Sequence, residues 1–272
     1  MPSPQALAAP ASGQTDETRP GILGLTGNGH AKQPMHLNAD GGIEWQQDTK
    51  SYIARNNAVA VRGDVTLRAD TITAYYRDAA KPGTTEIWRV IAAGNVKITT
   101  PSQTVVGDTA TYDLDKAVVL ITGKAIRLTT RQDIVTAHDG LEWWDLKQMA
   151  VARGKATVLR GDRQLHADVL WADIAAAGPG RPAHVTRVDA AGHVVVSSPG
   201  QTGTANSGVY DADTGKVTLH GNVVLVRGDN VLSGEYGVVD LTNGVSRLMP
   251  EAKTQPRVEG LVFPRPNAPS KE

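Results

Sequence analysis

The chain of 272 residues contains no cysteine and few aromatic side chains. The absence of cysteine excludes disulfides, thiolate metal sites and a cysteine nucleophile, and it fits either the cytosol or the periplasm. Aromatic residues make up only 4% of the chain, with a single phenylalanine. An interior must therefore be built from slim aliphatic side chains. Such side chains can close into a dry core or leave a lumen, and composition leaves both possibilities open.

Charge of one sign is also missing, because 28 basic and 28 acidic residues give a formal net charge of zero. A nucleic-acid-binding protein usually carries a basic excess, so we expect no nucleic-acid partner. No run of about 18 apolar residues, the length that crosses a bilayer as a helix, occurs in the sequence.

The two ends of the chain differ in composition from the rest. Residues 1–33 begin with a stretch rich in alanine, proline and serine, which fits a leader remnant or a disordered N-terminus. Residues 251–272 are proline-rich and predict a flexible tail.

The segment between these ends is a tandem duplication. Residues 39–45, with the sequence ADGGIEW, recur as AHDGLEW at residues 137–143, an offset of 98. Further pairs keep this offset without gaps, including Ala69 with Ala167 and Tyr112 with Tyr210. We therefore expect two continuous halves, residues 34–136 and 137–250, with proline- and glycine-containing insertions at 81–83 and 178–182 in corresponding loops.

Short runs rich in valine, isoleucine, threonine and tyrosine fill both halves, with glycine, asparagine or aspartate about every 8 to 12 residues. This spacing is typical of antiparallel β-sandwiches and barrels. The sequence predicts an all-β protein, an elongated antiparallel sandwich built from tandem repeats. In such an array the first strand, near residues 35–43, and the last, near 238–248, would be unpaired edges.

Several of the expected strands are apolar on both faces, notably around residues 118–121, 194–196 and 223–226. A half-solvated strand should alternate, so both faces of these strands need apolar neighbours. The apolar pairs after each turn residue stand at +2/+4 in some repeats and at +3/+5 in others. Our candidates for groove-lining residues are Val59, Val61, Val96, Ile98, Ile126, Leu128, Leu159, Val194, Val196, Val224 and Val226.

Motifs for catalysis are missing from the sequence. There is no phosphate-binding glycine loop, no His-Glu-x-x-His and no Gly-x-Ser-x-Gly. The seven histidines contain no i, i+4 pair, and the acidic residues recur at turn positions, where aspartate bonds nearby backbone N–H groups. We expect no catalytic residues, no bound metal and no cofactor.

Three Arg-Gly-Asp tripeptides begin at Arg62, Arg160 and Arg227, each six residues after a turn residue. A turn of the repeat unit accounts for all three. A second interpretation places these arginines at groove mouths, where guanidinium groups would contact ligand phosphates.

The order of several short elements resembles the OstA-like (LptA) family, the β-jellyroll proteins of lipopolysaccharide transport. The elements are the Ala-Asp openings at 39, 69 and 167, the Gly-Asn-Val turns at 94 and 221, and the Tyr-Asp steps at 112 and 210. The resemblance covers about residues 34–250. It implies a periplasmic location and a jellyroll open at both ends, with lipid A acyl chains of lipopolysaccharide held between two sheets.

The resemblance also implies partners. These are an inner-membrane transporter component, an outer-membrane assembly protein of the same pathway, and further copies of the chain joined head to tail through edge strands. Two other functions stay open on the residues alone: a repetitive β-array with a structural or adhesive role, and a β-helix enzyme acting on polysaccharide.

Overall fold

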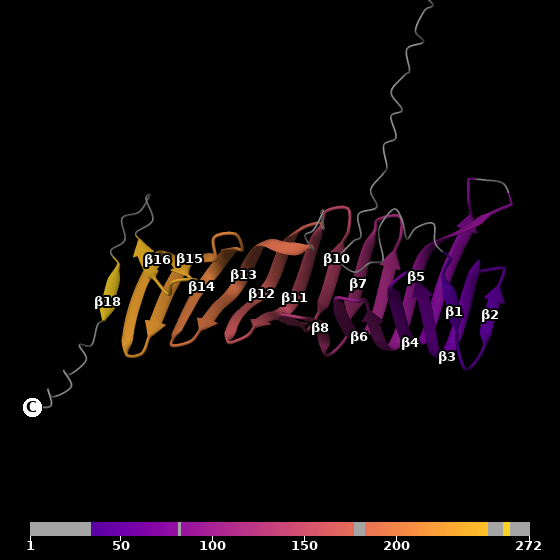
Figure 1. Cartoon of the computed structure of the whole chain (residues 1–272), viewed down its shortest axis with the longest axis horizontal. Helices are drawn as coiled ribbons and strands as arrows, with labels where there is room; N and C mark the ends of the chain where they lie inside the picture. The colour runs from indigo at the N-terminus through magenta and orange to yellow at the C-terminus, as the bar shows by residue number, and fades with distance from the viewer. Residues whose placement is uncertain (1–33, 81–82, 177–182, 250–257, 262–272) are drawn as a thin grey trace, which may run out of the picture.

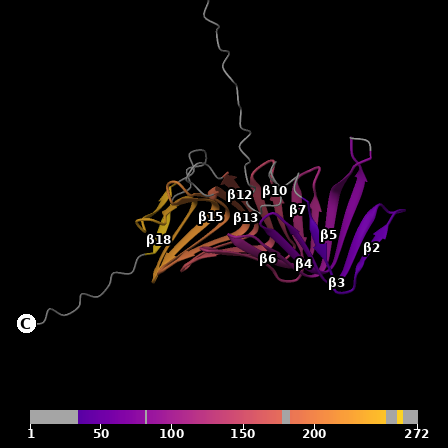
Figure 2. The same cartoon turned by 45° about the vertical axis from the view of Figure 1, so that its right-hand side comes forward.

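The computed structural model describes residues 34–80, 83–176, 183–249 and 258–261. These residues form an elongated antiparallel β-jellyroll that is open at both ends (Figures 1 and 2). In the first half the strands are β1 His36–Asn38, β2 Ile43–Gln46, β3 Ser51–Arg62, β4 Val65–Asp78, β5 Thr85–Thr99, β6 Gln103–Asp113, β7 Val118–Thr122 and β8 Ile126–Thr130. The rest are β9 Asp133–Ala137, β10 Gly140–Trp144, β11 Met149–Arg160, β12 Arg163–Ala175, β13 His184–Ser198, β14 Gln201–Asp211, β15 Lys216–Arg227, β16 Asn230–Asp240, β17 Ser246–Met249 and β18 Glu259–Leu261. No helix of these described residues is long and apolar enough to cross a membrane.

The long strands bend near their middle at β-bulges. The register between β5 and β6 shifts between Ala93 and Val96, where Gly94 and Asn95 have φ values of 79° and 49°. Two successive residues in the left-handed region kink a strand and re-aim its side chains. Each bulge therefore turns one strand into two segments.

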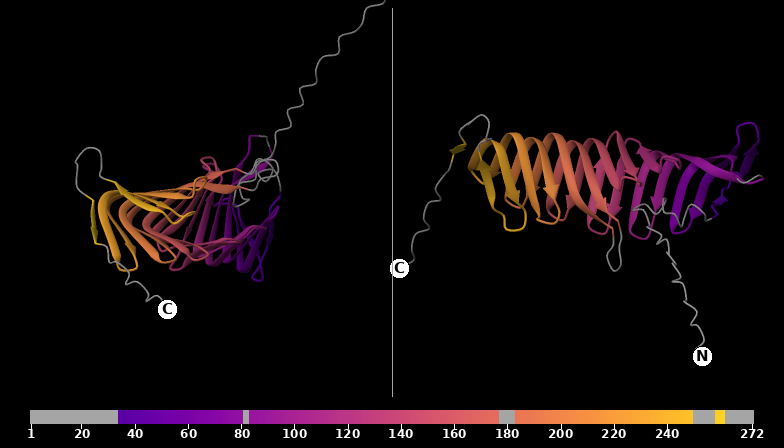
Figure 3. Two further views of the ribbon diagram at one scale, coloured as in Figure 1. Left: turned by 60° about the vertical axis from the view of Figure 1, so that its left-hand side comes forward. Right: turned by 90° about the horizontal axis from the view of Figure 1, so that it is seen from above.

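The bends divide the fold into two arms, which form two facing layers when viewed obliquely along the long axis (Figure 3). Arm A contains β2, β7, β10, β17 and one segment of each long strand. Arm B contains β1, β8, β9, β18 and the other segments. Buried residues of both arms belong to one hydrophobic cluster, so the core lies between the arms.

The recurring Ala-Asp and Gly-Asn elements meet at these bends. Asn95 donates from Nδ2 to both carboxylate oxygens of Asp70, at 3.2 and 3.0 Å, and a Cβ at Gly94 would collide with that carboxylate. In the second half, Nδ1 of His193 lies 2.8 Å from Asp168 Oδ2. The repeat motif thus fixes the corner at which the sheet folds over.

The strand bounds repeat at the offset of 98 that the sequence shows. β3 and β11 differ by 98 at both ends, and so do β6 and β14. The halves differ where β7 and β8 are separate strands but β15 is continuous. The insertions expected at 81–83 and 178–182 fall between β4 and β5 and between β12 and β13, and residues 81–82 and 177–182 lie outside the described residues.

The two edges of the array differ from the expected single strands. At the N-terminal edge, β1 pairs with arm B of β3 and β2 with arm A, because a turn at residues 39–42 separates them. At the C-terminal edge, β17 and β18 pair with the two segments of β16. The last edge therefore extends beyond residue 248, and β18 lies inside the stretch expected to be a flexible tail.

Candidate functional site: the trough between the arms

Alternate side chains on both arms face the space between them, because side chains alternate along a strand. On each arm they form two rows: a corner row beside the bend and a mouth row one step further away. The mouth row of arm B runs through Ala60, Leu67, Ile98, Val105, Leu128, Val135, Val158, Leu165, Val196, Gly203, Leu225 and Leu232. The mouth row of arm A runs through Tyr52, Ala74, Val90, Tyr112, Val119, Trp143, Ala150, Ala172, Val188, Tyr210, Val217 and Val239. The two rows form the walls of an apolar trough along the long axis.

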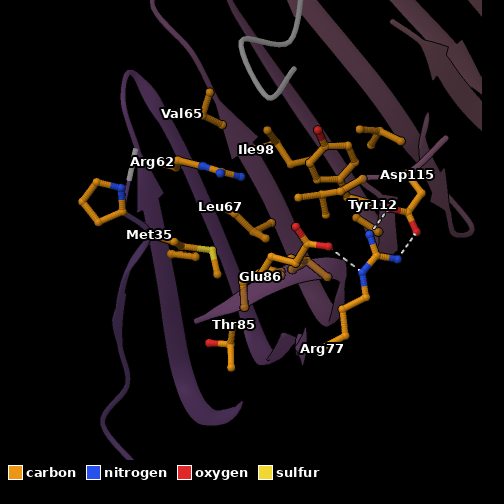
Figure 4. A pocket seen from close by; sticks show the side chains of 17 residues that line it. Met35, Arg62, Val65, Leu67, Arg77, Thr85, Glu86, Ile98, Tyr112 and Asp115 are labelled. Carbon is orange, nitrogen blue, oxygen red and sulfur yellow. Dashed lines mark hydrogen bonds and ion pairs between the residues drawn. The ribbon is translucent and has the colours of Figure 1, made fainter. Parts of the chain in front are cut away.

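A cavity of about 460 Å³ lies in the first half of this trough. Mouth-row residues from both arms line it, namely Ala60, Leu67, Ile98, Val90, Tyr112 and Val119. Figure 4 shows Leu67, Ile98 and Tyr112 around this space. The slim side chains of the sequence thus leave unfilled volume between the arms at this end.

A second cavity of about 260 Å³ lies in the other half. Its wall includes Val196, Leu225 and Leu232 from arm B and Val239 from arm A. The same rows therefore open toward both ends of the array.

Charged groups stand at the rim of the first cavity. Arg77 donates from Nη1 and Nη2 to the two oxygens of Asp115, both at 2.7 Å, and from Nε to Glu86 at 2.7 Å (Figure 4). These hydrogen bonds raise the pKa of Arg77 further above its ordinary value. The three side chains are about half exposed, so the cluster contributes little to stability and mainly sets the polarity of the rim.

Arg62 reaches into the cavity wall from arm B, opposite Tyr112 on arm A (Figure 4). Burial lowers the pKa of Arg62 and raises the pKa of Tyr112 to about 12. At neutral pH Arg62 is therefore charged and the hydroxyl of Tyr112 is neutral, and both stand beside an apolar volume.

The equivalent arginine of the second half, Arg160, is paired with a carboxylate. Arg160 donates from Nε and Nη2 to Asp133, at 2.6 and 2.9 Å, and this bond raises its pKa. Counting back 98 residues from Asp133 gives Met35, which lines the first cavity. At this position the second half has the carboxylate of Asp133, which pairs with Arg160, and the first half has the thioether of Met35.

Several residues expected to line a groove do face the interior. Val96, Ile98, Ile126, Val194 and Val196 are buried in the core cluster, and Leu128 packs against it. Ile98 lines the first cavity and Val196 the second.

Four of the expected residues are not brought into the interior. They are Val59, Val61, Leu159 and Val224, which alternate with interior residues such as Ala60, Val158 and Val223. Val226 shares their face and is 37% exposed, yet it lies at the rim of the second cavity.

The position of the bulge determines which alternate side chains of a strand face the interior. After a two-residue kink such as Gly94-Asn95, the interior positions are +2 and +4 from the first residue, as in Val96 and Ile98. Only the turn at Gly123, which separates β7 from β8, gives the +3 and +5 positions.

Sequence reasoning missed several cavity residues. The small side chain of Ala60 is a weak apolar signal, and Val90 and Val119 lie before the turn residues that set the counting of positions. Counting back four residues from Gly94 and from Gly123 finds the two valines.

The Arg-Gly-Asp tripeptides form hairpin turns, with Arg62 paired to Val65 and Arg227 to Asn230. Arg62 and Arg227 line the first and second cavities, whereas Arg160 pairs with Asp133. Within the described part of the chain, no three histidine, aspartate or glutamate side chains are grouped to hold a metal ion.

Comparison with known families identifies the class of protein that this fold represents. The family described as "LptA/(LptD N-terminal domain) LPS transport protein" matches residues 36–140 and again residues 139–245. The chain belongs to this family. It is a lipopolysaccharide (LPS) transport protein and not an enzyme, which rules out the β-helix enzyme acting on polysaccharide.

Among solved structures, the chain is similar to LptH, described as the LptA homologous periplasmic component of the LPS transport device from Pseudomonas aeruginosa. The identity is 13%, and the match covers 86% of this chain and 99% of that chain. The TM-score is 0.22. A search of curated proteins found no match.

Proposed function

We propose that the chain carries lipopolysaccharide by holding lipid A acyl chains in the trough between its arms. The observation that supports this most directly is the 460 Å³ cavity, which is walled by mouth-row residues of both arms. Burial of acyl chains yields about 0.8 kcal/mol per methylene group, so ten buried groups supply about 8 kcal/mol. Affinity of this size needs no covalent chemistry.

The proposed site consists of the interior residues of the trough. Of the residues expected from sequence, Val96, Ile98, Ile126, Leu128, Val194 and Val196 keep this role by position. Arg62 and Arg227 are the proposed phosphate contacts, because each stands beside a cavity. Arg160 would have to leave Asp133 first.

We further propose a periplasmic location, with the inner-membrane transporter component and the outer-membrane assembly protein of the pathway as partners.

The open edges support contacts with such partners or with further copies. Among the described strands β2 is paired in register with β3 alone, and it leaves Ile43 and Trp45 49% and 59% exposed. Strand addition at β2 or β17 would extend one trough into the next. A chain that stays monomeric at every concentration, as measured by light scattering, would argue against self-association.

The groove proposal is tested by filling the first cavity from one wall. Ala60 faces the cavity, and its neighbour Val59 faces away from it, so Ala60→Phe and Val59→Phe form a matched pair. We expect Ala60→Phe to weaken retention of lipid A by delipidated protein at least about tenfold, and Val59→Phe to leave it within about twofold. Equal binding by both variants, or no binding by the unmodified chain, would favour a dry structural or adhesive array.

A further inference from the structure

Trp143 stands in the middle of the trough and is almost fully enclosed. It lies on β10 in the mouth row of arm A, between Val119 and Ala150, and is 4% exposed. Val119 is also the residue at which the wall of the first cavity reaches β7, the strand paired with β10. Trp143 therefore lies one strand further along the trough than Val119, beside the residues that line that cavity.

The indole N–H of Trp143 has no hydrogen-bond acceptor among the described residues. In the first half, the equivalent Trp45 donates from Nε1 to the hydroxyl of Tyr76 at 2.8 Å. The offset of 98 places Ile174, whose side chain has no acceptor, where Tyr76 stands in the first half. The repeat thus kept the donor in the second half and lost its partner.

An enclosed donor without an acceptor destabilises a protein, and few such groups persist without a reason. Phenylalanine would fill most of the same space without this cost. Its neighbours in the mouth row, Val119 and Ala150, carry no side-chain acceptor, so on this face an acceptor for the N–H can come from a molecule held between the arms. Because the nitrogen is enclosed, the acceptor reaches it only when the arms separate around that molecule.

We infer that Trp143 is a ligand-binding residue whose indole N–H donates to a carbonyl oxygen of the lipid held in the trough. Acyl chains are attached through ester or amide groups, and their carbonyl oxygens are the polar atoms that must enter an apolar trough with the chains. A buried donor at this point would satisfy one of them. This inference rests on the proposed function, and it adds a polar contact that fixes the depth of the lipid.

The test follows the indole resonance of Trp143 by ¹H–¹⁵N NMR of the full chain. Trp143→Phe assigns the signal by its disappearance, and Tyr76→Phe moves only the signal of Trp45. Adding lipid A in detergent micelles should move the Trp143 indole proton downfield, whereas empty micelles should not. If lipid A binds and this resonance stays in place, the inference is wrong while the groove proposal stands.

Affinity provides a second readout. Trp143→Phe keeps most of the bulk and removes the donor, so lipid A should bind about tenfold more weakly. Binding of N-phenyl-1-naphthylamine, an apolar probe without a carbonyl group, should be unchanged. Circular dichroism establishes that the variant is folded. Equal losses for both ligands would mean that only packing was disturbed, and the inference would fall.

Ile174→Tyr supplies the missing acceptor from within the protein. It should shift the Trp143 resonance before lipid is added and should weaken lipid A binding, because the N–H is already satisfied. An unchanged lipid A affinity together with a shifted resonance would contradict the inference. Absence of lipid A binding to the unmodified chain would overturn the groove proposal and this inference together.

Discussion

The two halves of the chain share a backbone and differ in what they place inside it. β3 and β11, or β6 and β14, repeat at an offset of 98, yet Met35 stands where Asp133 does, and Tyr76 where Ile174 does. The cavity of the first half is the larger of the two, although an arginine lines each of them. The repeat therefore determines the scaffold, and a few substitutions at equivalent positions determine what each half can hold.

The largest effect should come from placing a charge in the corner row. Ile126 is 1% exposed, and Ile126→Asp should lower the free energy of unfolding by more than about 4 kcal/mol or prevent folding. Val224 faces outward, so Val224→Asp should cost less than about 1 kcal/mol. Urea unfolding of both variants measures the difference, and similar losses would show that the inward positions are misassigned.

The equivalent tryptophans should differ almost as much. Trp143→Ala should destabilise the protein by about 3–5 kcal/mol, because it removes an enclosed side chain. Trp45 is 59% exposed at the open edge, so Trp45→Ala should lower the free energy of unfolding by less than about 1 kcal/mol. A large loss for Trp45→Ala at low protein concentration would mean that the edge is more tightly packed than its exposure indicates.

Exchanging one side chain should make the first half resemble the second. Met35→Asp places a carboxylate opposite Arg62, as Asp133 stands opposite Arg160. We expect lipid A to bind about tenfold more weakly, since the guanidinium would pair with the new carboxylate instead of a phosphate. Isothermal titration with dephosphorylated lipid A is the control and should show no change. An equal loss of affinity for both ligands would show that Arg62 does not contact the phosphate.

The smallest effect concerns two equivalent turn aspartates. The backbone N–H of Lys116 lowers the pKa of Asp113, and that of Thr214 lowers the pKa of Asp211. A lowered folded pKa gives stability that is present above the unfolded value near 3.9 and is lost as pH falls through the folded pKa. Below about pH 4 the thermal midpoint should fall faster for the natural chain than for Asp113→Asn with Asp211→Asn, by about 1–3 °C. Parallel curves would show that these turns do not sense pH.

Much of the fold could be predicted from the sequence, because the duplication and the strand chemistry are local patterns. The inward face of each strand could not, because a kink such as Gly94-Asn95 changes the side-chain parity in a way that composition does not reveal. Pairings across the trough, such as Arg62 opposite Tyr112, depend on how the arms fold over. The lost acceptor of Trp143 becomes visible only when Tyr76 is seen to bond Trp45.

The proposed function requires lipid to occupy the space between the arms. A photo-reactive amino acid at Leu67 or Leu232 would project into the first or second cavity, whereas the same residue at Arg68 or Ser233 would face outward. After irradiation with lipopolysaccharide, adducts should form at Leu67 and Leu232 and be absent at Arg68 and Ser233. Adducts at the outward positions alone, or equal adducts at all four, would contradict the claim.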